Sequence, residues 1–229
     1  MHRENICECG IKGLDEAIGG GFDRGSLILL EGPPGAGKSI FAAKFVHHGA
    51  KVLGEKGIYV SFGVSKKQFY QHMKTLGMDF SELEEKNLIV FLDYPTIVDK
   101  KSLDNIFRSL IDEIMENNAR RIVIDPVTIL TRILPPIELE ATIRNILKRV
   151  IEDLNATALL VANVELEQDR QLHSVLEFMA DVVLRIRVRI TEAHEIKRTL
   201  EIVKFRGRGV KKYSLELYIG KEGIHVRCV

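Results

Sequence analysis

The chain has 229 residues, 45% of them hydrophobic, so it is long enough to bury a sizeable core. Its 33 basic and 32 acidic residues leave a net charge of +1, which gives no global reason to expect a nucleic-acid or membrane-surface partner. No apolar run approaches the roughly 18 residues of a membrane span, and the first residues lack a signal-peptide core. We therefore expect one cytoplasmic domain over residues 1–229.

Three cysteines are too few for a disulfide framework. Cys7 and Cys9, together with Cys228 and His2, are one conceivable set of metal ligands. These residues lie near the two ends of the chain, where mobility is the usual expectation. We therefore do not expect a metal there.

A phosphate-binding pattern follows the first predicted strand, the apolar run from Leu27 to Leu30, and precedes a helical pattern from Ile40 to Val46. The pattern G-x-x-x-x-G-K-[S/T] is filled by Gly32, Pro33, Pro34, Gly35, Ala36, Gly37, Lys38 and Ser39. A strand, a glycine-rich loop and a helix place backbone N–H groups and a helix N-terminus around phosphates. We expect these residues and Ile40 to bind ATP, with Lys38 on the β and γ phosphates and the Ser39 hydroxyl on Mg²⁺. The alternative is a glycine-rich turn with a chance lysine.

Strands and helices alternate beyond this loop. The predicted strands are Ile58 to Phe62, Leu88 to Leu92, Ile122 to Asp125 and Ala158 to Asn163. The predicted helices are Lys66 to Leu76, Leu103 to Met115 and Glu138 to Leu154. This order predicts an α/β fold with a mostly parallel sheet flanked by helices. The neighbouring His47 and His48 show no ligand spacing and are expected on the surface.

The last quarter of the chain has a different pattern. From Val182 to Ile190, apolar residues alternate with Arg185, Arg187 and Arg189, which predicts a half-solvated strand. Two further strand segments, Ile196 to Phe205 and Tyr213 to Ile219, precede a turn at residues 220–223 and a last short strand. We expect these strands to form an antiparallel C-terminal extension of the sheet.

A second candidate element for catalysis is the apolar strand that begins at Arg121 and ends in the carboxylate of Asp125. In enzymes with a phosphate-binding loop, an aspartate at the carboxyl end of a neighbouring strand holds the Mg²⁺ ion or its water shell. We therefore expect Asp125 to bind the metal together with Ser39. The alternative is an aspartate that merely forms the turn after its strand.

Several segments carry a resemblance to one family. They are Gly10-Ile11-Lys12-Gly13-Leu14-Asp15, Gly19-Gly20-Gly21-Phe22, Gly25-Ser26 with the phosphate loop, the Asp125 strand, Thr157 to Val161, Val175 to Asp181, and Val203-Lys204-Phe205-Arg206-Gly207. With these segments, from about Cys9 to Val226, the chain resembles the KaiC-like ATPases, a branch of the RecA superfamily. The resemblance implies a RecA-like P-loop NTPase core with ATP bound at a subunit boundary. It also implies a homo-oligomer, with a hexameric ring as one form.

The chain departs from that family at one important place. In the family, the strand that matches Ile58 to Phe62 runs into one or two glutamates that deprotonate the attacking water, whereas this chain has Gly63 and Val64 there. General-base catalysis is typically worth about 10² to 10⁴ in rate, so we expect ATP binding with weak or absent hydrolysis. Glu165, two residues past Asn163 at the end of its strand, is the candidate for a substitute base.

Lys204 and Arg206 match a Lys-x-Arg pair that, in KaiC-like rings, contacts the γ phosphate of the neighbouring subunit. The resemblance therefore implies that these two residues bind ATP across the subunit boundary. A solvated strand end is another interpretation. A nucleic-acid face is a third, because residues 185–212 hold ten basic and three acidic residues. We disfavour a nucleic-acid partner because no aromatic residue interleaves the three arginines of the alternating strand.

Two functional classes compete on these observations. The first is a nucleotide-dependent regulatory or assembly module whose ATP-bound or ADP-bound state is read by an unidentified protein partner. The second is a slow ATPase of the RecA type. A recombinase-like DNA accessory protein is a third interpretation that depends on analogy of fold and on the basic stretch.

Overall fold

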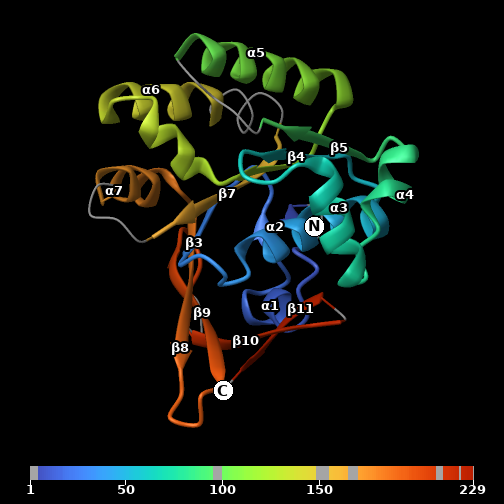
Figure 1. Cartoon of the computed structure of the whole chain (residues 1–229), viewed down its shortest axis with the longest axis vertical. Coiled ribbons are helices and arrows are strands. Elements are labelled where there is room, and N and C mark those ends of the chain that lie inside the picture. Colours follow the sequence, from blue (N-terminus) through green and yellow to red (C-terminus); the bar gives the residue numbers. More distant parts are fainter. Residues whose placement is uncertain are drawn as a thin grey trace.

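A nine-stranded sheet forms the centre of this computed structural model, which describes residues 5–94, 100–147, 155–164, 170–209, 214–221 and 223–228. The strand order is β11-β10-β9-β8-β3-β7-β6-β4-β5 (Figure 1). The parallel strands are β3 (Leu27–Gly32), β4 (Gly57–Ser61), β5 (Ile89–Asp93), β6 (Arg121–Asp125), β7 (Thr157–Asn163) and β8 (Val182–Ile190). The antiparallel extension is formed by β9 (Ile196–Phe205), β10 (Ser214–Gly220) and β11 (Gly223–Cys228). The predicted α/β class, with its antiparallel C-terminal strands, is confirmed.

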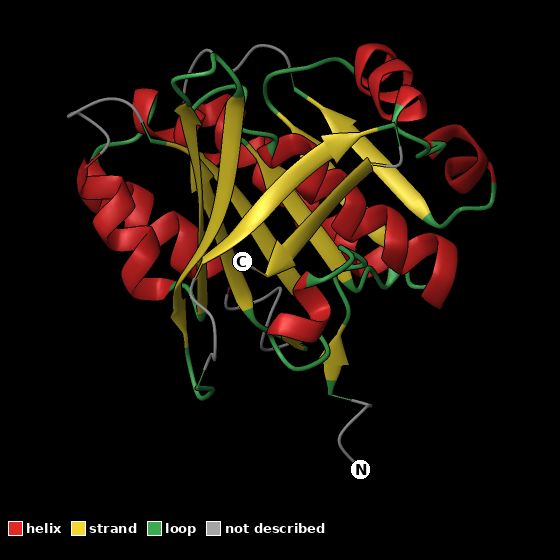
Figure 2. Ribbon diagram, turned by 90° about the horizontal axis from the view of Figure 1, so that it is seen from below, coloured by secondary structure: helices red, strands yellow, loops and turns green. Residues whose placement is uncertain are grey.

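Helices cover both faces of this twisted sheet (Figure 2). On one face lie α2 (Lys38–Leu53), α3 (Lys66–Thr75) and α4 (Phe80–Glu85), and on the other lie α5 (Lys100–Asn117), α6 (Pro136–Leu147) and α7 (Arg170–Met179). The smaller elements are β1 (Ile6–Cys7), α1 (Leu14–Ala17), β2 (Phe22–Asp23) and the 3₁₀ helix η1 (Val127–Arg132). The sequence prediction missed α4 and α7, and the end of its helix from Glu138 to Leu154 lies outside the described residues.

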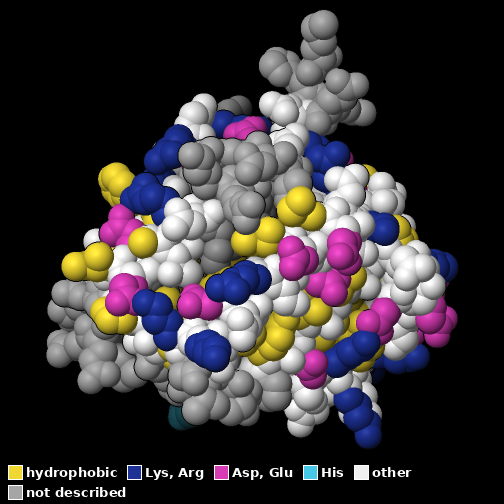
Figure 3. All heavy atoms as spheres, turned by 90° about the horizontal axis from the view of Figure 1, so that it is seen from above, with side chains coloured by type: hydrophobic (Ala, Val, Ile, Leu, Met, Phe, Trp, Pro, Cys, Tyr) yellow, Lys and Arg dark blue, Asp and Glu magenta, His cyan; other side chains and the backbone are white. Residues whose placement is uncertain are grey.

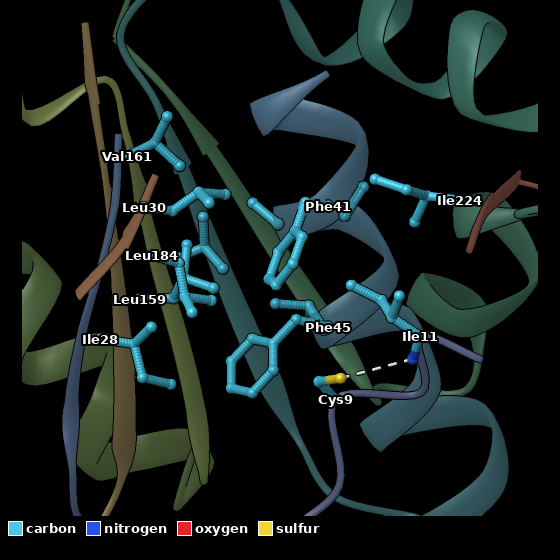
Figure 4. Close-up of a cluster of buried hydrophobic side chains, with 14 of the residues drawn as sticks. Cys9, Ile11, Ile28, Leu30, Phe41, Phe45, Leu159, Val161, Leu184 and Ile224 are labelled. Carbon is cyan, nitrogen blue, oxygen red and sulfur yellow. Dashed lines mark hydrogen bonds between the residues drawn. The ribbon is translucent and has the colours of Figure 1, made fainter. Parts of the chain in front are cut away.

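β3 is the strand that carries the phosphate-loop pattern at its end. It pairs in parallel with β7 along one edge and with β8 along the other, and all six of its residues are buried. On one face, Phe41 and Phe45 of α2 pack against Ile28 and Leu30 (Figure 4). On the other face, Leu29 belongs to the cluster that contains α5 to α7. Burial on both faces explains the continuous apolar run of this strand.

β8 follows its predicted alternation only in part. Val183 is buried like its neighbours Val182 and Leu184, because it packs in the same cluster as Leu176 of α7. Ile190, which the alternation places on the buried side, is 74% exposed. The end of β8 and the start of β9 extend beyond the rest of the sheet (Figure 1), so no second layer covers that residue.

The surface carries both signs of charge. On the face seen in Figure 3, basic and acidic side chains are interspersed, as expected from the nearly equal numbers of each. None of the described helices combines the length and the apolar character that a membrane span needs.

His47 contradicts the sequence prediction, because its side chain is only 4% exposed. The ring packs against Phe80, with 5.6 Å between the ring centroids. Burial, together with the positive charges of Lys44 and Lys51, lowers the pKa of His47 to about 4. The adjacent alanine, phenylalanine and valine residues of α2 are also buried, so this part of the helix is apolar over more than one face.

Arg121, the first residue of β6, is fully buried and joins three parts of the chain. Its Nε donates a hydrogen bond to Glu55 Oε2 at 2.6 Å, and its Nη1 donates to the backbone carbonyls of Glu8 at 2.6 Å and Phe45 at 2.9 Å. Burial of Glu55 opposes ionisation, but the charge of Arg121 outweighs it and lowers the pKa of Glu55. The N-terminal segment and α2 are thereby fastened to the sheet.

Glu55→Gln tests this buried ion pair. The variant should lower the free energy of unfolding by about 3 kcal/mol, because removal of one partner leaves a buried charge without its counterion. Urea denaturation of wild type and variant measures the difference. Glu84→Gln is the control, since the Lys66–Glu84 pair has side chains that are 42% and 34% exposed. That substitution should cost less than about 1 kcal/mol, and equal losses in the two variants would contradict the special role of Arg121.

Candidate nucleotide-binding site

The phosphate-loop pattern forms a tight turn between the end of β3 and the start of α2. Gly35 and Gly37 have φ angles of +74° and +102°, a region that residues with a Cβ rarely adopt. A Cβ on Gly37 would also lie 2.3 Å from Cδ1 of Ile219. Because α2 begins at Lys38, the free N–H groups of its first turn lie at the loop. This geometry suits a phosphate group.

Lys38 lies inside the loop. Its side chain is largely buried, and its Nζ donates hydrogen bonds to the carbonyl oxygens of Gly32 at 2.8 Å and Pro33 at 2.7 Å. A buried ammonium group gains from a strong anion nearby, because the loop carbonyls carry only partial charges. The position of Lys38 suits contact with a phosphate chain.

Asp125 ends β6 and lies close to the start of α2. Its Oδ2 accepts a hydrogen bond from the Tyr59 hydroxyl at 2.6 Å, and its carboxylate is also hydrogen-bonded to Ser39. Burial raises the pKa of Asp125, although both hydrogen bonds and the charge of Lys38 act in the other direction. A divalent cation would favour the charged carboxylate. One carboxylate and one hydroxyl, completed by phosphate oxygens and water, are a donor set that Mg²⁺ accepts.

A cavity of about 620 Å³ joins these groups. This volume is typical of a small-molecule site. Its phosphate-loop end is lined by Pro34, Gly35, Gly37, Lys38, Ser39 and Ile40. Asp125 and Asn163, from the carboxyl ends of β6 and β7, line it as well. The remainder is lined by Phe69, His72, Met73 and Thr75 of α3, by Leu76 directly after it, and by Arg198 and Ile219 from the antiparallel strands. The cavity is therefore polar at the loop and mainly apolar at α3.

Two lining or supporting residues were not found from the sequence. Arg198 of β9 extends to the phosphate loop, where its Nη2 donates to the Gly35 carbonyl at 3.5 Å. Its Nε is buried without a hydrogen-bond partner among the described residues. Tyr59 of β4 was predicted as a strand residue without a role, yet its hydroxyl bonds to Asp125. Both contacts join residues far apart in sequence, which local patterns do not reveal.

Gly63 and Val64 line the same cavity, which is the location that the family resemblance implied for them. The Ser61 hydroxyl donates to the Val64 carbonyl at 2.7 Å and accepts from the Val64 N–H at 3.1 Å, so the turn is held by a serine. Among the described lining residues, Asp125 is the only carboxylate. Glu165 lies outside the residues that the structure describes.

Lys204 and Arg206 do not lie at the phosphate loop of their own chain. Lys204 is paired with Val183 near the start of β8, at the opposite end of the sheet from the loop. Its Nζ donates to the backbone carbonyls of Glu177 at 2.8 Å and Phe178 at 3.1 Å, at the end of α7. Arg206 Nη1 donates to Asp181 at 2.9 Å. Within one subunit, both cations therefore bond to the segment around the end of α7.

The two N-terminal cysteines lie in the core. Cys7 and Cys9 are fully buried beside α2, and burial raises the pKa of both thiols. Sγ of Cys9 accepts a hydrogen bond from the Ile11 N–H at 3.4 Å (Figure 4). His2 lies outside the described residues, as does the side chain of Cys228. No group of three or more His, Cys, Asp or Glu in the described ranges is placed to hold a metal.

Comparison with known proteins gives a consistent result. The family model described as the KaiC ATPase matches residues 7–228. A UPF0273 protein of Pyrococcus horikoshii is 30% identical over 86% of this chain and 84% of its own length. The circadian clock protein KaiC2 of Synechocystis is 29% identical over 96% of this chain but only 39% of its own length. The crystal structure of a KaiC-like protein from Pyrococcus horikoshii has a TM-score of 0.84 and 28% identity, and covers 96% of this chain and 98% of that one. The chain belongs to the KaiC family of ATPases.

Proposed function

We propose that residues 1–229 form one ATP-binding unit that uses residues Gly32 to Ile40 for the phosphates. The observation that carries this proposal is the position of Lys38 inside the loop, beside the Ser39–Asp125 pair in one cavity. Mg²⁺ would bind between the Ser39 hydroxyl and the Asp125 carboxylate, and there it would neutralise phosphate charge. ADP would use the same contacts except those to the γ phosphate.

The remainder of the cavity suits the adenosine part of the ligand. Met73 of α3, Leu76 directly after it and Ile219 of β10 line the same cavity and supply apolar surface for a base. The Arg198 guanidinium lies near the loop and can donate hydrogen bonds to the ligand through its Nε. The triphosphate would therefore extend from α3 toward Lys38.

We further propose that this site binds ATP with weak or absent hydrolysis. Gly63 and Val64 occupy the positions at which the family resemblance implies catalytic glutamates, and both line the cavity. Glycine and valine have no group that can accept the proton of an attacking water. Phosphate and Mg²⁺ contacts do not depend on that group, so binding would persist when turnover is slow.

ATP would also act on assembly. Lys204 and Arg206 are too far from their own loop to contact its ligand, because β3 separates the two ends of the sheet by six residues, or roughly 20 Å. Contact with the γ phosphate of a neighbouring subunit is the arrangement that uses both cations. We propose a homo-oligomer, with a hexameric ring as one form, whose nucleotide state an unidentified protein partner reads.

The ion pairs of the basic C-terminal stretch count against a nucleic-acid partner. Arg185 pairs with Glu31 and Glu177, and Arg187 pairs with Glu201. Arg208 pairs with Asp23. Nucleic-acid affinity depends on cations that neutralise phosphates, and these cations already have acidic partners in the chain.

Lys38→Ala tests the phosphate site. The variant should bind ATP about 10- to 100-fold more weakly, because it loses a charge-assisted contact while the fold remains. Isothermal titration calorimetry gives the affinity, and circular dichroism monitors the fold. Lys51→Ala, an exposed residue of the same helix, is the matched control and should bind ATP as the wild type does. Unchanged ATP affinity in Lys38→Ala would remove the central claim.

Gly63→Glu tests the explanation for weak hydrolysis. A Cβ at this position would meet only Pro126 Cδ, at 3.7 Å, which is ordinary van der Waals contact, and Gly63 lines the open cavity. Steady-state turnover of the wild type should be very slow, and Gly63→Glu should raise it at least about tenfold by supplying a general base. Gly63→Gln is the matched control, because an amide of the same shape cannot take the proton.

Steady-state turnover, measured as phosphate release, also tests whether Glu165 acts as a substitute base. Rapid wild-type turnover that disappears in Glu165→Gln would identify Glu165 as the base and would refute the proposed weak hydrolysis. Equal turnover in Gly63→Glu and Gly63→Gln would show that the missing carboxylate is not what limits the rate.

Arg206→Ala tests assembly. ATP bound by two subunits favours their association by mass action, so ATP should raise the oligomer mass of the wild type above that with ADP or no nucleotide. Loss of the Arg206 contact should remove about 1.5 to 3 kcal/mol of that coupling. Light scattering at fixed protein concentration measures the effect, with Arg187→Ala as a control for loss of a surface arginine. If Arg206→Ala responds to ATP as the wild type does, contact across the boundary is wrong.

A further inference from the structure

A polar cluster lies directly behind the phosphate loop, between the ends of β3 and β7 and the helix α7. Glu31, the residue before Gly32, is 1% exposed, which is exceptional for a carboxylate. One of its oxygens, Oε2, is 3.2 Å from Nδ1 of His173, and the other, Oε1, accepts a hydrogen bond from Arg185 Nε at 2.6 Å. Neither Glu31 nor His173 belongs to a motif that is recognisable in the sequence.

The other ring nitrogen of His173 also faces an acceptor. Nε2 lies 3.0 Å from the backbone carbonyl oxygen of Asn163, which lines the nucleotide cavity at the end of β7. A neutral imidazole carries one N–H and one lone pair, so it can satisfy only one of two acceptors. Its lone pair would face either a carboxylate or a carbonyl oxygen. Both contacts are favourable only when both ring nitrogens carry protons.

The alternative, a protonated Glu31, conflicts with its surroundings. Burial alone would raise the pKa of Glu31, but the hydrogen bond from His173 and the charge of Arg185 outweigh it, so the pKa of Glu31 is lowered. In the described part of the chain, Glu31 of β3 contacts His173, Arg185 of β8 pairs with the same Glu31 carboxylate, and Glu177 lies one turn further along α7. Arg185 is shared between Glu31 and Glu177, with 2.7 Å from its Nη2 to Glu177 Oε1. Two carboxylates around one guanidinium carry one negative charge in excess, which a positive charge on His173 would balance.

We propose that His173 is held as a positively charged imidazolium and acts as a positioning residue that ties the ends of β3 and β7, beside the nucleotide cavity, to α7. Loss of its proton breaks one of the two ties and weakens ATP binding. This inference rests on the proposed nucleotide site, because its functional readout is ATP affinity. It adds a regulatory property, since an ordinary histidine is mostly neutral at pH 7.5.

The link to the ligand is short. Asn163 lines the cavity, and the N–H of the next residue, Val164, donates to the Gly32 carbonyl at 3.3 Å. That same carbonyl accepts the hydrogen bond from Lys38 Nζ. The imidazolium therefore contacts the two strand ends that position the carbonyl and the lysine of the phosphate loop.

The first experiment determines the charge of His173 without any nucleotide. Side-chain ¹⁵N NMR of the full chain at pH 7.5 should show both ring nitrogens of His173 in the protonated range, assigned by their loss in His173→Gln. An unprotonated ring nitrogen at this pH would overturn the proposal. Because no ATP is present, this result is independent of the proposed function.

The second experiment measures ATP affinity at pH 6.0 and pH 8.5 in excess Mg²⁺. His194→Asn is the matched control, since His194 is an exposed residue of the turn between β8 and β9. Between pH 6.0 and pH 8.5, the ATP affinity of the wild type and of His194→Asn should fall. This fall should be at least about fivefold larger than the fall for His173→Gln. Glu31→Gln should bind ATP with no such extra pH dependence, because the amide introduced at that position can donate to a neutral imidazole.

The outcomes separate the two proposals. If His173→Gln has the same pH profile as the wild type, or lowers affinity equally at both pH values while the wild type is flat, the residue is only structural and the inference fails. If the wild type binds no ATP at either pH, the proposed function is wrong and ATP affinity can no longer be used as a test. The NMR experiment still determines the charge of His173 in that case.

Discussion

The parallel pairing of β3 with strands on both of its edges is the constraint on which the remainder of this structure depends. β7 and β8 fix the register of β3 through backbone hydrogen bonds, and α2 packs its phenylalanines against one face. β3 ends at Gly32, and the chain continues directly into the loop that precedes α2. Because the carboxyl ends of β6 and β7 lie at the same edge of the sheet, Asp125 and Asn163 reach the loop without any special local sequence.

Buried carboxylates occur at both ends of the sheet, and they differ in the partners that surround them. At the amino end, the Glu55 carboxylate pairs with both Arg121 and Arg24, and Arg121 also donates to two backbone carbonyls, so this group holds a junction of the fold. At the carboxyl end, Asp125 has hydrogen-bond donors but a raised pKa, because burial outweighs the donors and the charge of Lys38. The first carboxylate has two cationic partners within the chain and a lowered pKa, whereas the second would gain from a cation. That difference distinguishes a structural carboxylate from one that suits a metal ion.

Most of the fold could be predicted from the sequence, because its signals are local. The bounds of β8 and β9 match the predicted strands, and α3 and α5 lie where their apolar periodicity placed them. The failures have physical causes. His47 is buried because α2 is covered on more than one face, so helical periodicity gave no exposed side. Arg198 and Tyr59 act through contacts with residues distant in sequence, which only the sheet order brings together. The phosphate loop was predictable since its chemistry is contiguous.

Under the proposed function, nucleotide binding and water activation depend on different parts of the fold. The loop that suits phosphate is one turn whose backbone geometry is set by glycines, and the Asp125 carboxylate comes from a strand paired on both edges. Gly63 and Val64 follow β4, in a short turn that Ser61 holds by its own hydroxyl. A substitution in that turn disturbs neither the sheet register nor the loop. Under the proposed function, a carboxylate at position 63 can therefore be absent while every described contact of the candidate phosphate site remains in place, so that hydrolysis can be lost without loss of binding.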